Sequence, residues 1–476
     1  MSQVKNRFSF PLLIFSLVLF LLPFERMYDR FFRKFLYAHT YLPKVIIKQL
    51  YIFPSDLLIL LGFIFFFLAK KVSLKKLGFE GSNKYGLFFL CTFLIPLCFY
   101  AAETDLAIWV RFFYFSLTIL LFNWILTAFR SHEVPPFLIL VSWLFLLIGT
   151  FETVIAYIQY FTQSGVGLSI IGEPKLNSPN MIRAEFFSQE GTGKWLIDTL
   201  FFHAPSAEVF RAYGTFPSPN LLGGFYIGYL FALWALWFHY SSKKAHFFLG
   251  LLIAFETFGL FLTYSRAGIF AYGLLVLFAF GYFLLSGKIS YCKSLFKVAC
   301  LSIGLSFVLL LPQIITRGGI INYPEGVQES DRGRLFAQDY AWKMIKKRPW
   351  FGTGYGRYSQ ECAKELPANL KHIKPMVHNI YFLIAVESGL VGLGLFLGLC
   401  FLAIYRAFQK RENPVIFCFL LFFLGFLMVG FCDYYLFFFQ QGRLLFFSLA
   451  ALLISSSYAE RIFIFSSTKA PIQNEG

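Results

Sequence analysis

The stretch PFLILVSWLFLLIGTFETVIAYIQY, residues 136–160, carries Glu152 as its only charged side chain. A helix of this length crosses the roughly 30 Å hydrocarbon core of a bilayer. Hydrocarbon offers the backbone no hydrogen-bond partner, so a spanning segment of this kind forms a helix and not a strand. Similar apolar runs recur along nearly the whole chain. The sequence therefore predicts an all-α integral membrane protein.

The composition agrees with that fold class. Of the 476 residues, 58% are hydrophobic and 14% are charged, which is incompatible with two or three soluble domains. A formal net charge of +17 would suggest nucleic acid as the partner of a soluble protein. In a membrane protein, Lys and Arg in cytoplasmic loops explain much of this charge, so we expect no nucleic-acid partner.

We expect about twelve transmembrane helices by the length criterion. Lys and Arg gather in alternate connections, such as residues 70–84, 243–244 and 288–297, and the positive-inside rule places these connections in the cytoplasm. Both termini are then cytoplasmic. The expected helices are residues 8–24, 54–69, 85–100, 106–129, 136–160, 219–239, 246–263, 267–286, 297–313, 378–405, 414–432 and 434–455.

Two connections on the outer side are long enough to suggest a function of their own. The basic segment 25–53 is also assigned to the outer side, where it would lie on anionic headgroups. The expected segments are helices 1–5 in residues 1–160, the first long periplasmic loop in 161–218, helices 6–9 in 219–313, the second long periplasmic loop in 314–377, helices 10–12 in 378–455 and a cytoplasmic tail in 456–476.

The second long loop contains an amphipathic pattern. In RLFAQDYAWKMIKK, residues 334–347, apolar side chains fall on one half of a helical wheel, opposite Asp339 and Lys343. Pro349 ends this pattern, and the glycine-rich turn 352–356 follows. We expect a helix beside the outer membrane surface that could cover a cavity.

Arg211 and Asn220 lie in FRAYGTFPSPNLLGG, residues 210–224, a turn that leads into the sixth predicted helix. Pro217 and Pro219 fix the backbone of this turn. A guanidinium group is suited to forked, charge-assisted contacts with phosphate oxygens. The alternative is an interfacial arginine that extends toward lipid headgroups.

Arg266 is a second candidate, because it lies in TYSRAG, residues 263–268, a very short connection at the membrane boundary. A charge held there needs a partner or a wet cavity, and it is a functional hypothesis by default. Extension toward the headgroups is again the alternative, although the tight turn restricts it.

His378 and Asn379 open VHNIYFLIAVESG, residues 377–389, where the second long loop rejoins the membrane. An imidazole is suited to proton transfer near neutral pH. The alternative is a histidine that hydrogen-bonds the backbone at a helix start. Glu387 follows half a helical turn out of phase with His378, so we expect it to satisfy a neighbouring helix and not to pair with that histidine.

Sites for metals and cofactors have little support. The acidic pair in ETD, residues 103–105, supplies too few ligands for a divalent ion. The eight cysteines lie mostly inside apolar runs and give neither a disulfide framework nor CxxC spacing. GTGYG at 352–356 lacks the flanking strand and helix of a nucleotide-binding loop. We expect neither a metal ion nor a cofactor.

The order and spacing of these features carry a resemblance. An arginine before GTFPSPN, then SRAG at the next outer turn, then RPWFGTGYG after a loop helix, then HNIYFLIAVESG closely resemble the O-antigen ligase and O-antigen polymerase-like superfamily of bacterial inner-membrane proteins. The motifs cover roughly residues 205–400, and the first half of the chain agrees in hydropathy alone.

The resemblance implies a glycan on undecaprenyl diphosphate as donor, at the periplasmic face of the inner membrane, and glycosyl transfer without a metal. Arg211 and Arg266 would stabilise the diphosphate leaving group, and His378 would act as the base for the acceptor hydroxyl. Asn220 and Asn379 belong to the same motifs and are expected in substrate binding. Arg332 and Arg334 in the long loop are candidates for acceptor phosphates.

Three functions remain open. The leading one is a ligase that joins O-antigen to lipid A-core in lipopolysaccharide biosynthesis. A polymerase would use a second lipid-linked glycan as acceptor and carries the same motifs. A transporter of another class would line a path with the same charged residues, but we find no internal repeat, and the polar residues gather at one face.

Overall fold

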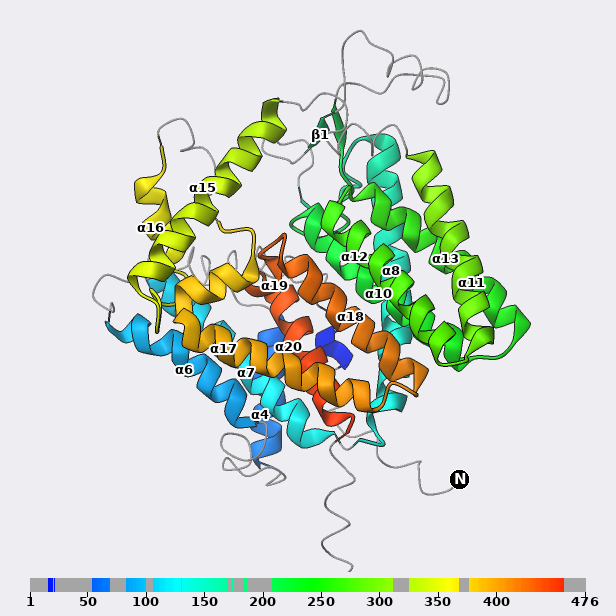
Figure 1. Ribbon diagram of the computed structural model, residues 1–476, viewed down its shortest axis with the longest axis horizontal. Helices are drawn as coiled ribbons and strands as arrows, with labels where there is room; N and C mark the ends of the chain where they lie inside the picture. The colour runs from blue at the N-terminus through cyan, green and yellow to red at the C-terminus, as the bar shows by residue number, and fades with distance from the viewer. Residues whose placement is uncertain are drawn as a thin grey trace, which may run out of the picture.

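The computed structural model describes residues 16–19, 21, 54–68, 83–99, 106–129, 131–168, 171, 173–174, 183–185, 208–310, 325–367 and 376–457. In these ranges the protein is helical except for one antiparallel pair of short strands (Figure 1). The basic segment 25–53 and most of the first predicted helix lie outside them. The elements are α4 (Pro54–Leu68), α6 (Asn83–Phe99), α7 (Leu106–Ala128), α8 (Val134–Thr162), β1 (Arg183–Glu185), β2 (Glu208–Phe210), α10 (Pro219–His239), α11 (Lys243–Leu262), α12 (Arg266–Leu285), α13 (Ile289–Leu309), α15 (Glu325–Lys347), α16 (Tyr358–Glu365), α17 (Ile380–Gln409), α18 (Pro414–Gly430), α19 (Tyr435–Phe438) and α20 (Gln440–Ser455).

The helical character is confirmed, and the structure contains candidate membrane spans. Seven of the described helices are long and apolar enough to cross a bilayer, and α8, which contains residues 136–160, is one of them. Three further apolar helices are shorter: Lys84–Phe99, Pro414–Gly430 and Gln440–Ser455. The count of twelve and the cytoplasmic placement of the termini stay predictions.

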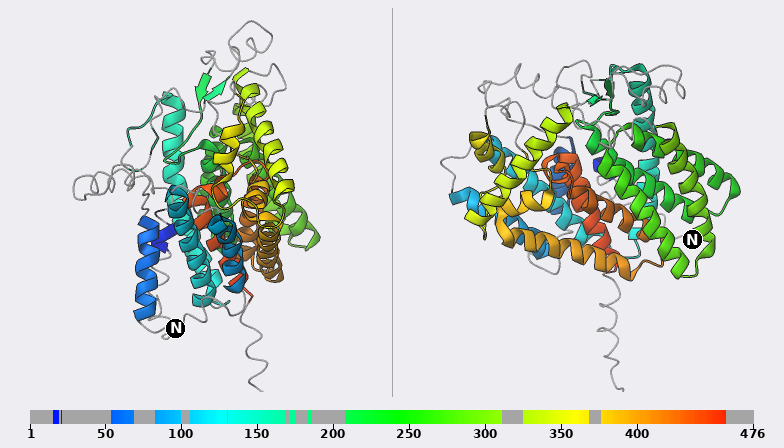
Figure 2. Two further views of the ribbon diagram at one scale, coloured as in Figure 1. Left: turned by 90° about the vertical axis from the view of Figure 1, so that its left-hand side faces the viewer. Right: turned by 45° about the horizontal axis from the view of Figure 1, so that its top comes forward.

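The centre of the molecule is α10, whose membrane-spanning window is fully buried. It packs against α8, α11, α12 and α18, while α17 packs against α6 and α20 on the other side of the molecule. Helices α18 and α20 contact each other and join the two groups (Figure 1). In the left view of Figure 2 the long helices lie side by side, with β1 and β2 beyond one end of the bundle.

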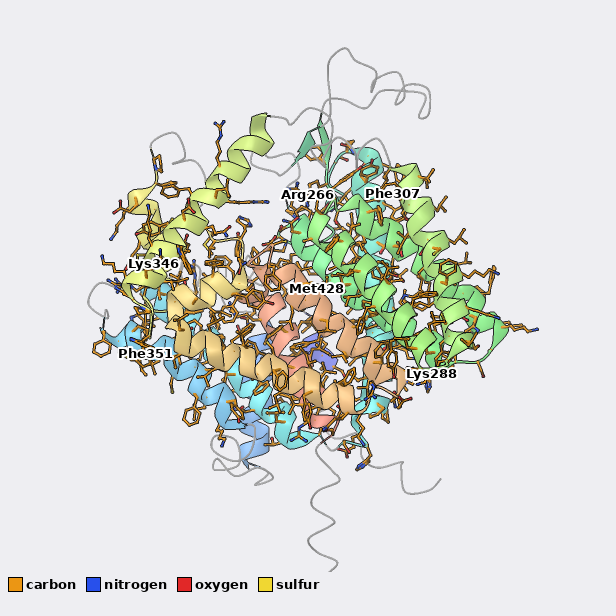
Figure 3. The ribbon with its side chains drawn as sticks, viewed as in Figure 1. Arg266, Lys288, Phe307, Lys346, Phe351 and Met428 are labelled. Atoms are coloured by element: carbon orange, nitrogen blue, oxygen red, sulfur yellow. The ribbon has the colours of Figure 1, made fainter. Side chains whose placement is uncertain are left out.

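The two ends of the bundle carry different polar contacts. Lys288 forms an ion pair with Glu412 at 2.8 Å, so the α12–α13 and α17–α18 connections lie together. Figure 3 shows Lys288 at the opposite end of α12 from Arg266. The connections that the charge pattern assigned to opposite sides of the membrane are thus at opposite ends here.

Two predicted helices are interrupted. Residues 434–455 form α19 and α20, because Phe439 is in an extended conformation between them. Helix α17 contains a break at Gly389, which has φ 73°. A side chain there would collide with the backbone of Trp350, with its Cβ 2.0 Å from the carbonyl oxygen. The break in α17 falls at Gly389, directly after Glu387 and Ser388, and α20 begins at the polar stretch QQGR, residues 440–443, but hydropathy averaged over a whole segment does not locate either interruption.

The turn after α15 fills the break in α17. The N–H groups of Leu390 and Val391 donate to the carbonyls of Pro349 and Trp350, at 2.7 and 3.3 Å. In return, the N–H groups of Thr353 and Gly354 donate to the carbonyls of Val386 and Glu387, at 2.8 and 2.9 Å. The predicted amphipathic helix is confirmed as α15, and this exchange of backbone hydrogen bonds fixes its C-terminal end to α17. These hydrogen bonds supply partners for the backbone groups that the break in α17 leaves without them.

Candidate active site

Arg211 is placed by a turn that two buried side chains of α8 hold. The carboxylate of Glu152 accepts hydrogen bonds from the N–H and the hydroxyl of Thr215, at 2.9 and 2.6 Å. The amide oxygen of Gln159 accepts from the N–H groups of Tyr213 and Gly214, and its nitrogen donates to the carbonyl of Gly214. Because these side chains replace the water that a turn would otherwise need, the turn can sit inside the bundle.

The guanidinium of Arg211 is buried, with 3% of the residue exposed. Its Nε donates to the carbonyl of Thr263 at 2.8 Å, and a terminal nitrogen donates to the side-chain oxygen of Asn220. Arg211 therefore joins the turn before α10 to the turn before α12. This contact also orients Asn220, because an amide that accepts at its oxygen must donate at its nitrogen.

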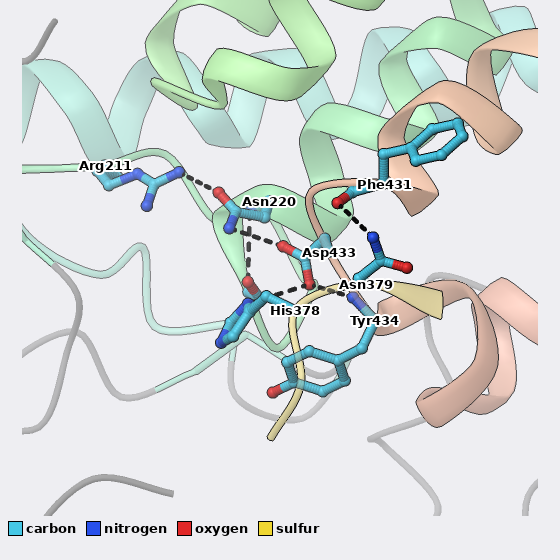
Figure 4. Close-up of polar contacts among 8 residues, drawn as sticks. Arg211, Asn220, His378, Asn379, Phe431, Asp433 and Tyr434 are labelled. Atoms are coloured by element: carbon cyan, nitrogen blue, oxygen red, sulfur yellow. Dashed lines mark hydrogen bonds and ion pairs between the residues drawn. The ribbon is translucent and has the colours of Figure 1, made fainter. Parts of the chain in front are cut away.

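Asp433 accepts the hydrogen bond from the side-chain nitrogen of Asn220. The Nδ2 of Asn220 donates to Oδ2 of Asp433 at 2.9 Å, and the backbone N–H of Tyr434 donates to Oδ1 at 2.8 Å. The same Oδ1 lies 3.8 Å from Nδ1 of His378 (Figure 4). The His378 side chain is 25% exposed and that of Asp433 is 8% exposed, so the imidazole lies between a buried carboxylate and the outside.

Tyr434 lies against the same imidazole. The ring centroids of His378 and Tyr434 are 4.9 Å apart in an edge-to-face arrangement. Burial raises the pKa of the Tyr434 phenol to about 12, Asp433 adds to the rise, and the charge of Arg334 opposes it. The phenol therefore stays protonated at neutral pH. Arg334, on α15, is also near enough to act on it.

Asn379 caps helix α17 and takes no part in the network of contacts formed by Arg211, Asn220, Asp433 and His378. Its Oδ1 accepts hydrogen bonds from the N–H groups of Tyr381 and Phe382, which makes it the N-cap of α17. Its Nδ2 donates to the carbonyl of Phe431 at 3.2 Å. The capping role that the sequence left open for His378 thus falls to its neighbour.

Arg266 and Arg332 lie outside this network. Arg266 is the first residue of α12, its side chain is exposed, and Ser265 caps the helix before it. Arg332 is exposed on α15. Neither takes part in a hydrogen bond or ion pair within the part of the chain that the structure describes. The structure joins Arg211, Asn220 and His378, leaves these two arginines on the surface, and adds Asp433 and Tyr434, which the sequence analysis missed.

Glu387 is buried, and it has partners in the glycine-rich turn as well as on a neighbouring helix. Its carboxylate accepts hydrogen bonds from the backbone N–H groups of Gly356 and Tyr358, and it also interacts electrostatically with Arg111 of α7. It stays apart from His378, as predicted. Among the described residues, no group of three or more His, Cys, Asp or Glu could hold a metal ion.

A comparison with family models adds a finding about the same region. Residues 247–397 match the family described as O-antigen ligase. Over these residues the chain is similar to that family, which supports its resemblance to an O-antigen ligase-like superfamily. The O-antigen ligase match spans Arg266 and His378, whereas Arg211, Asn220 and Asp433 lie outside its limits and reach His378 through the contacts described above. No curated protein matches the chain.

The matched family suggests a glycosyltransferase-like activity of the ligase or polymerase type, with lipid-linked glycans as substrates. The apolar helices agree with a multi-pass membrane protein. Residues of five described segments, the turn before α10, the turn before α12, α15, the start of α17 and the α18–α19 connection, come together at one end of the bundle to form the candidate site.

Proposed function

We propose that this protein is an O-antigen ligase-type glycosyltransferase. It transfers a glycan from undecaprenyl diphosphate to lipid A-core, at the periplasmic face of the bacterial inner membrane. One observation carries this proposal: the chain of contacts from Arg211 through Asn220 and Asp433 to His378. It combines a buried cation with an oriented imidazole, as a reaction with a phosphate leaving group and a hydroxyl nucleophile requires.

The reaction is a direct displacement at the anomeric carbon. The acceptor hydroxyl forms the new C–O bond, and its proton goes to His378. The bond between the anomeric carbon and the diphosphate oxygen breaks, and its electron pair leaves with the lipid diphosphate. A single displacement inverts the anomeric configuration. Because Nδ1 of His378 faces Asp433, Nε2 is the nitrogen that receives the proton, and the resulting imidazolium is stabilised by the carboxylate.

Charge on the leaving group is met by arginine in this proposal. Arg211 is held in place by two hydrogen bonds, so it needs no rearrangement as the charge develops. Arg266 is exposed at the same end of the bundle and can approach a diphosphate at the surface. No metal or cofactor takes part in the proposed step.

The acceptor lies on the other side of His378 in this proposal. Arg334 is near the Tyr434 phenol, and Arg332 is exposed on the same helix, so α15 can bring two cations to acceptor phosphates. Asn379 caps α17 by accepting two backbone hydrogen bonds, and it would contribute by fixing the position of the neighbouring His378 imidazole.

The test is glycan transfer by the purified protein in liposomes, with undecaprenyl-diphosphate-linked glycan, lipid A-core and EDTA. We expect glycosylated lipid A-core from the wild type, and loss of the product in His378→Ala and Arg211→Ala. Lys288→Ala, at the opposite end of the bundle, serves as the control and should retain transfer. Full transfer by both site variants would disprove the site assignment. No transfer to lipid A-core by the wild type would disprove the ligase function, and the absence of transfer to a second lipid-linked glycan as well would favour a transporter.

The polymerase is the second candidate, because the family match covers both types. Lipopolysaccharide from a deletion strain, separated on a gel, distinguishes them. Loss of all long chains together with accumulated lipid-linked polymer supports the ligase. Core with a single repeat supports the polymerase.

A further inference from the structure

The short helix α19 follows Asp433 directly and comprises a single turn. Its last carbonyls cannot find partners in a following turn, because Phe439 is extended and α20 begins at Gln440. One side chain supplies the missing donors. Nη1 of Arg443, on α20, donates to the carbonyls of Phe437 and Phe438, both at 2.9 Å. The place of α19, and with it the place of Asp433, therefore depends on Arg443.

The same nitrogen of Arg443 reaches the glycine-rich turn. Nη1 also donates to the hydroxyl of Tyr355 at 3.2 Å, and Nη2 donates to the side-chain oxygen of Gln440 at 2.6 Å. Gln440 in turn donates to Asp56 of α4 at 2.6 Å. Arg443 is 4% exposed, and these hydrogen bonds stabilise its buried charge. A side chain without a planar guanidinium group could not make all of these contacts.

Tyr355 is fixed to the half of α17 that carries His378. Its ring stacks on Phe115 of α7, with centroids 5.3 Å apart. The residues on either side of it bind α17: the N–H of Gly354 donates to the carbonyl of Glu387, and the N–H of Gly356 donates to the Glu387 carboxylate. Glu387 lies in the helical segment that His378 precedes and Asn379 caps. Arg443 thus contacts α19, which follows Asp433, and the turn that binds the first part of α17, which follows His378.

We infer that Arg443 is a positioning residue for the His378–Asp433 pair, and that it acts by locking α19 to the turn at Tyr355. This inference rests on the proposed transferase function. It assigns no contact between Arg443 and substrate. Displacement of a reacting group by about 1 Å can lower a rate by roughly 100-fold, so a residue in this place affects turnover without touching the reactants.

The experiment compares Arg443→Lys, Asp433→Asn and the double variant in the liposome transfer assay, with Arg406→Lys as the matched control. Arg406 lies at the far end of α17, where its Nη1 donates to Ser457 at 3.3 Å. We expect Arg443→Lys to lower kcat by about 10- to 100-fold and to leave KM for the donor within about 2-fold. The pH profile of kcat/KM should change in the same way as that of Asp433→Asn, and the control should match the wild type.

The double variant separates positioning from general support of the fold. If Arg443 acts through Asp433, the double variant is about as active as Asp433→Asn alone, because the two losses do not multiply. Losses that multiply, or full activity of Arg443→Lys, would overturn the inference. Should Arg443→Lys fail to fold, Tyr355→Phe removes one of the hydrogen bonds, with an expected loss in kcat of roughly 2- to 10-fold and the same comparison with Asp433→Asn. Wild-type transfer in this assay supports the proposed function whichever result the variants give.

Discussion

At the residue scale, Arg211 differs from an arginine that extends toward headgroups, because it is buried and bonded to both Thr263 and Asn220. The forked geometry of its side chain matters for this arrangement. A lysine carries the charge but cannot make both contacts in fixed directions. Residues 211, 220 and 433 thus act as a unit. The arginine orients the amide of Asn220, and that amide orients the carboxylate of Asp433.

Arg211→Lys is therefore expected to lower kcat/KM for glycan transfer by about 100-fold, while the protein still folds. Initial rates in the liposome assay and the thermal midpoint in detergent measure the two effects. Lys288→Arg, which keeps the charge at the opposite end, provides the comparison. Unchanged kcat/KM would mean that charge alone is needed at position 211.

Glu152 and Glu256 are both fully buried in helices, yet they differ in their contacts. Glu152 accepts two hydrogen bonds from Thr215, whereas neither carboxyl oxygen of Glu256 has a partner in the described residues. We expect Glu152→Gln to reduce stability by about 1–3 kcal/mol, because an amide nitrogen then faces a donor and loosens the Arg211 turn. Glu256→Gln should change stability and transfer little. Thermal unfolding of both variants checks this contrast. Equal losses of stability would show that the burial of the carboxyl group, and not its hydrogen bonds, determines the effect.

At the element scale, the break in α17 forms a joint with the turn after α15, by which we mean that backbone hydrogen bonds connect the turn to α17 on both sides of the break. Gly389 and Gly352 both have positive φ, and a Cβ on Gly352 would lie 2.3 Å from the carbonyl oxygen of Val386. Only glycine allows the turn and the broken helix to approach so closely. This joint holds α15, with Arg332 and Arg334, in a fixed relation to the start of α17.

Gly389→Ala is expected to destabilise the protein by more than about 1 kcal/mol and to lower transfer, because the turn must move away from α17. Gly394→Ala in the same helix is the control. Nothing lies within 4 Å of a Cβ at that position, so alanine should be neutral or stabilise the helix. Thermal midpoints and transfer rates of the two variants test this prediction. Similar values for both would contradict the proposed role of Gly389 in the contact between α17 and the turn.

At the scale of the whole molecule, the polar contacts divide between the two ends of the bundle. The end with Arg211 and His378 is predicted to face the periplasm, and the end with Lys288 and Glu412 the cytoplasm. Single cysteines at positions 266 and 288, in a variant without the eight native cysteines, test this orientation. In intact spheroplasts, a membrane-impermeant maleimide should label position 266 and spare position 288. The reverse pattern would place the site on the cytoplasmic side.

The sequence predicted most of the described helices closely and the site in part, although α13 begins at Ile289 and not at residue 297. Apolar length is a local property, so α7, α8, α10 and α12 begin and end within a few residues of the predicted bounds. The motifs in 205–400 pointed to Arg211, Asn220 and His378, which the structure joins. Asp433 was overlooked, although a carboxylate in the short outer connection CDYY was the available signal, because its partner is 213 residues away in sequence.

By itself, the sequence determined that this protein is a helical membrane protein, because the length and hydropathy of each run suffice for a helix in hydrocarbon. It also supplied the motifs of a ligase-like superfamily. Only the tertiary structure decided that Arg211 orients Asp433 through Asn220, that α17 is broken to receive a turn, and that Arg443 fixes α19. These features depend on hydrogen bonds between segments far apart in the chain, and no local pattern of apolar residues encodes such pairs.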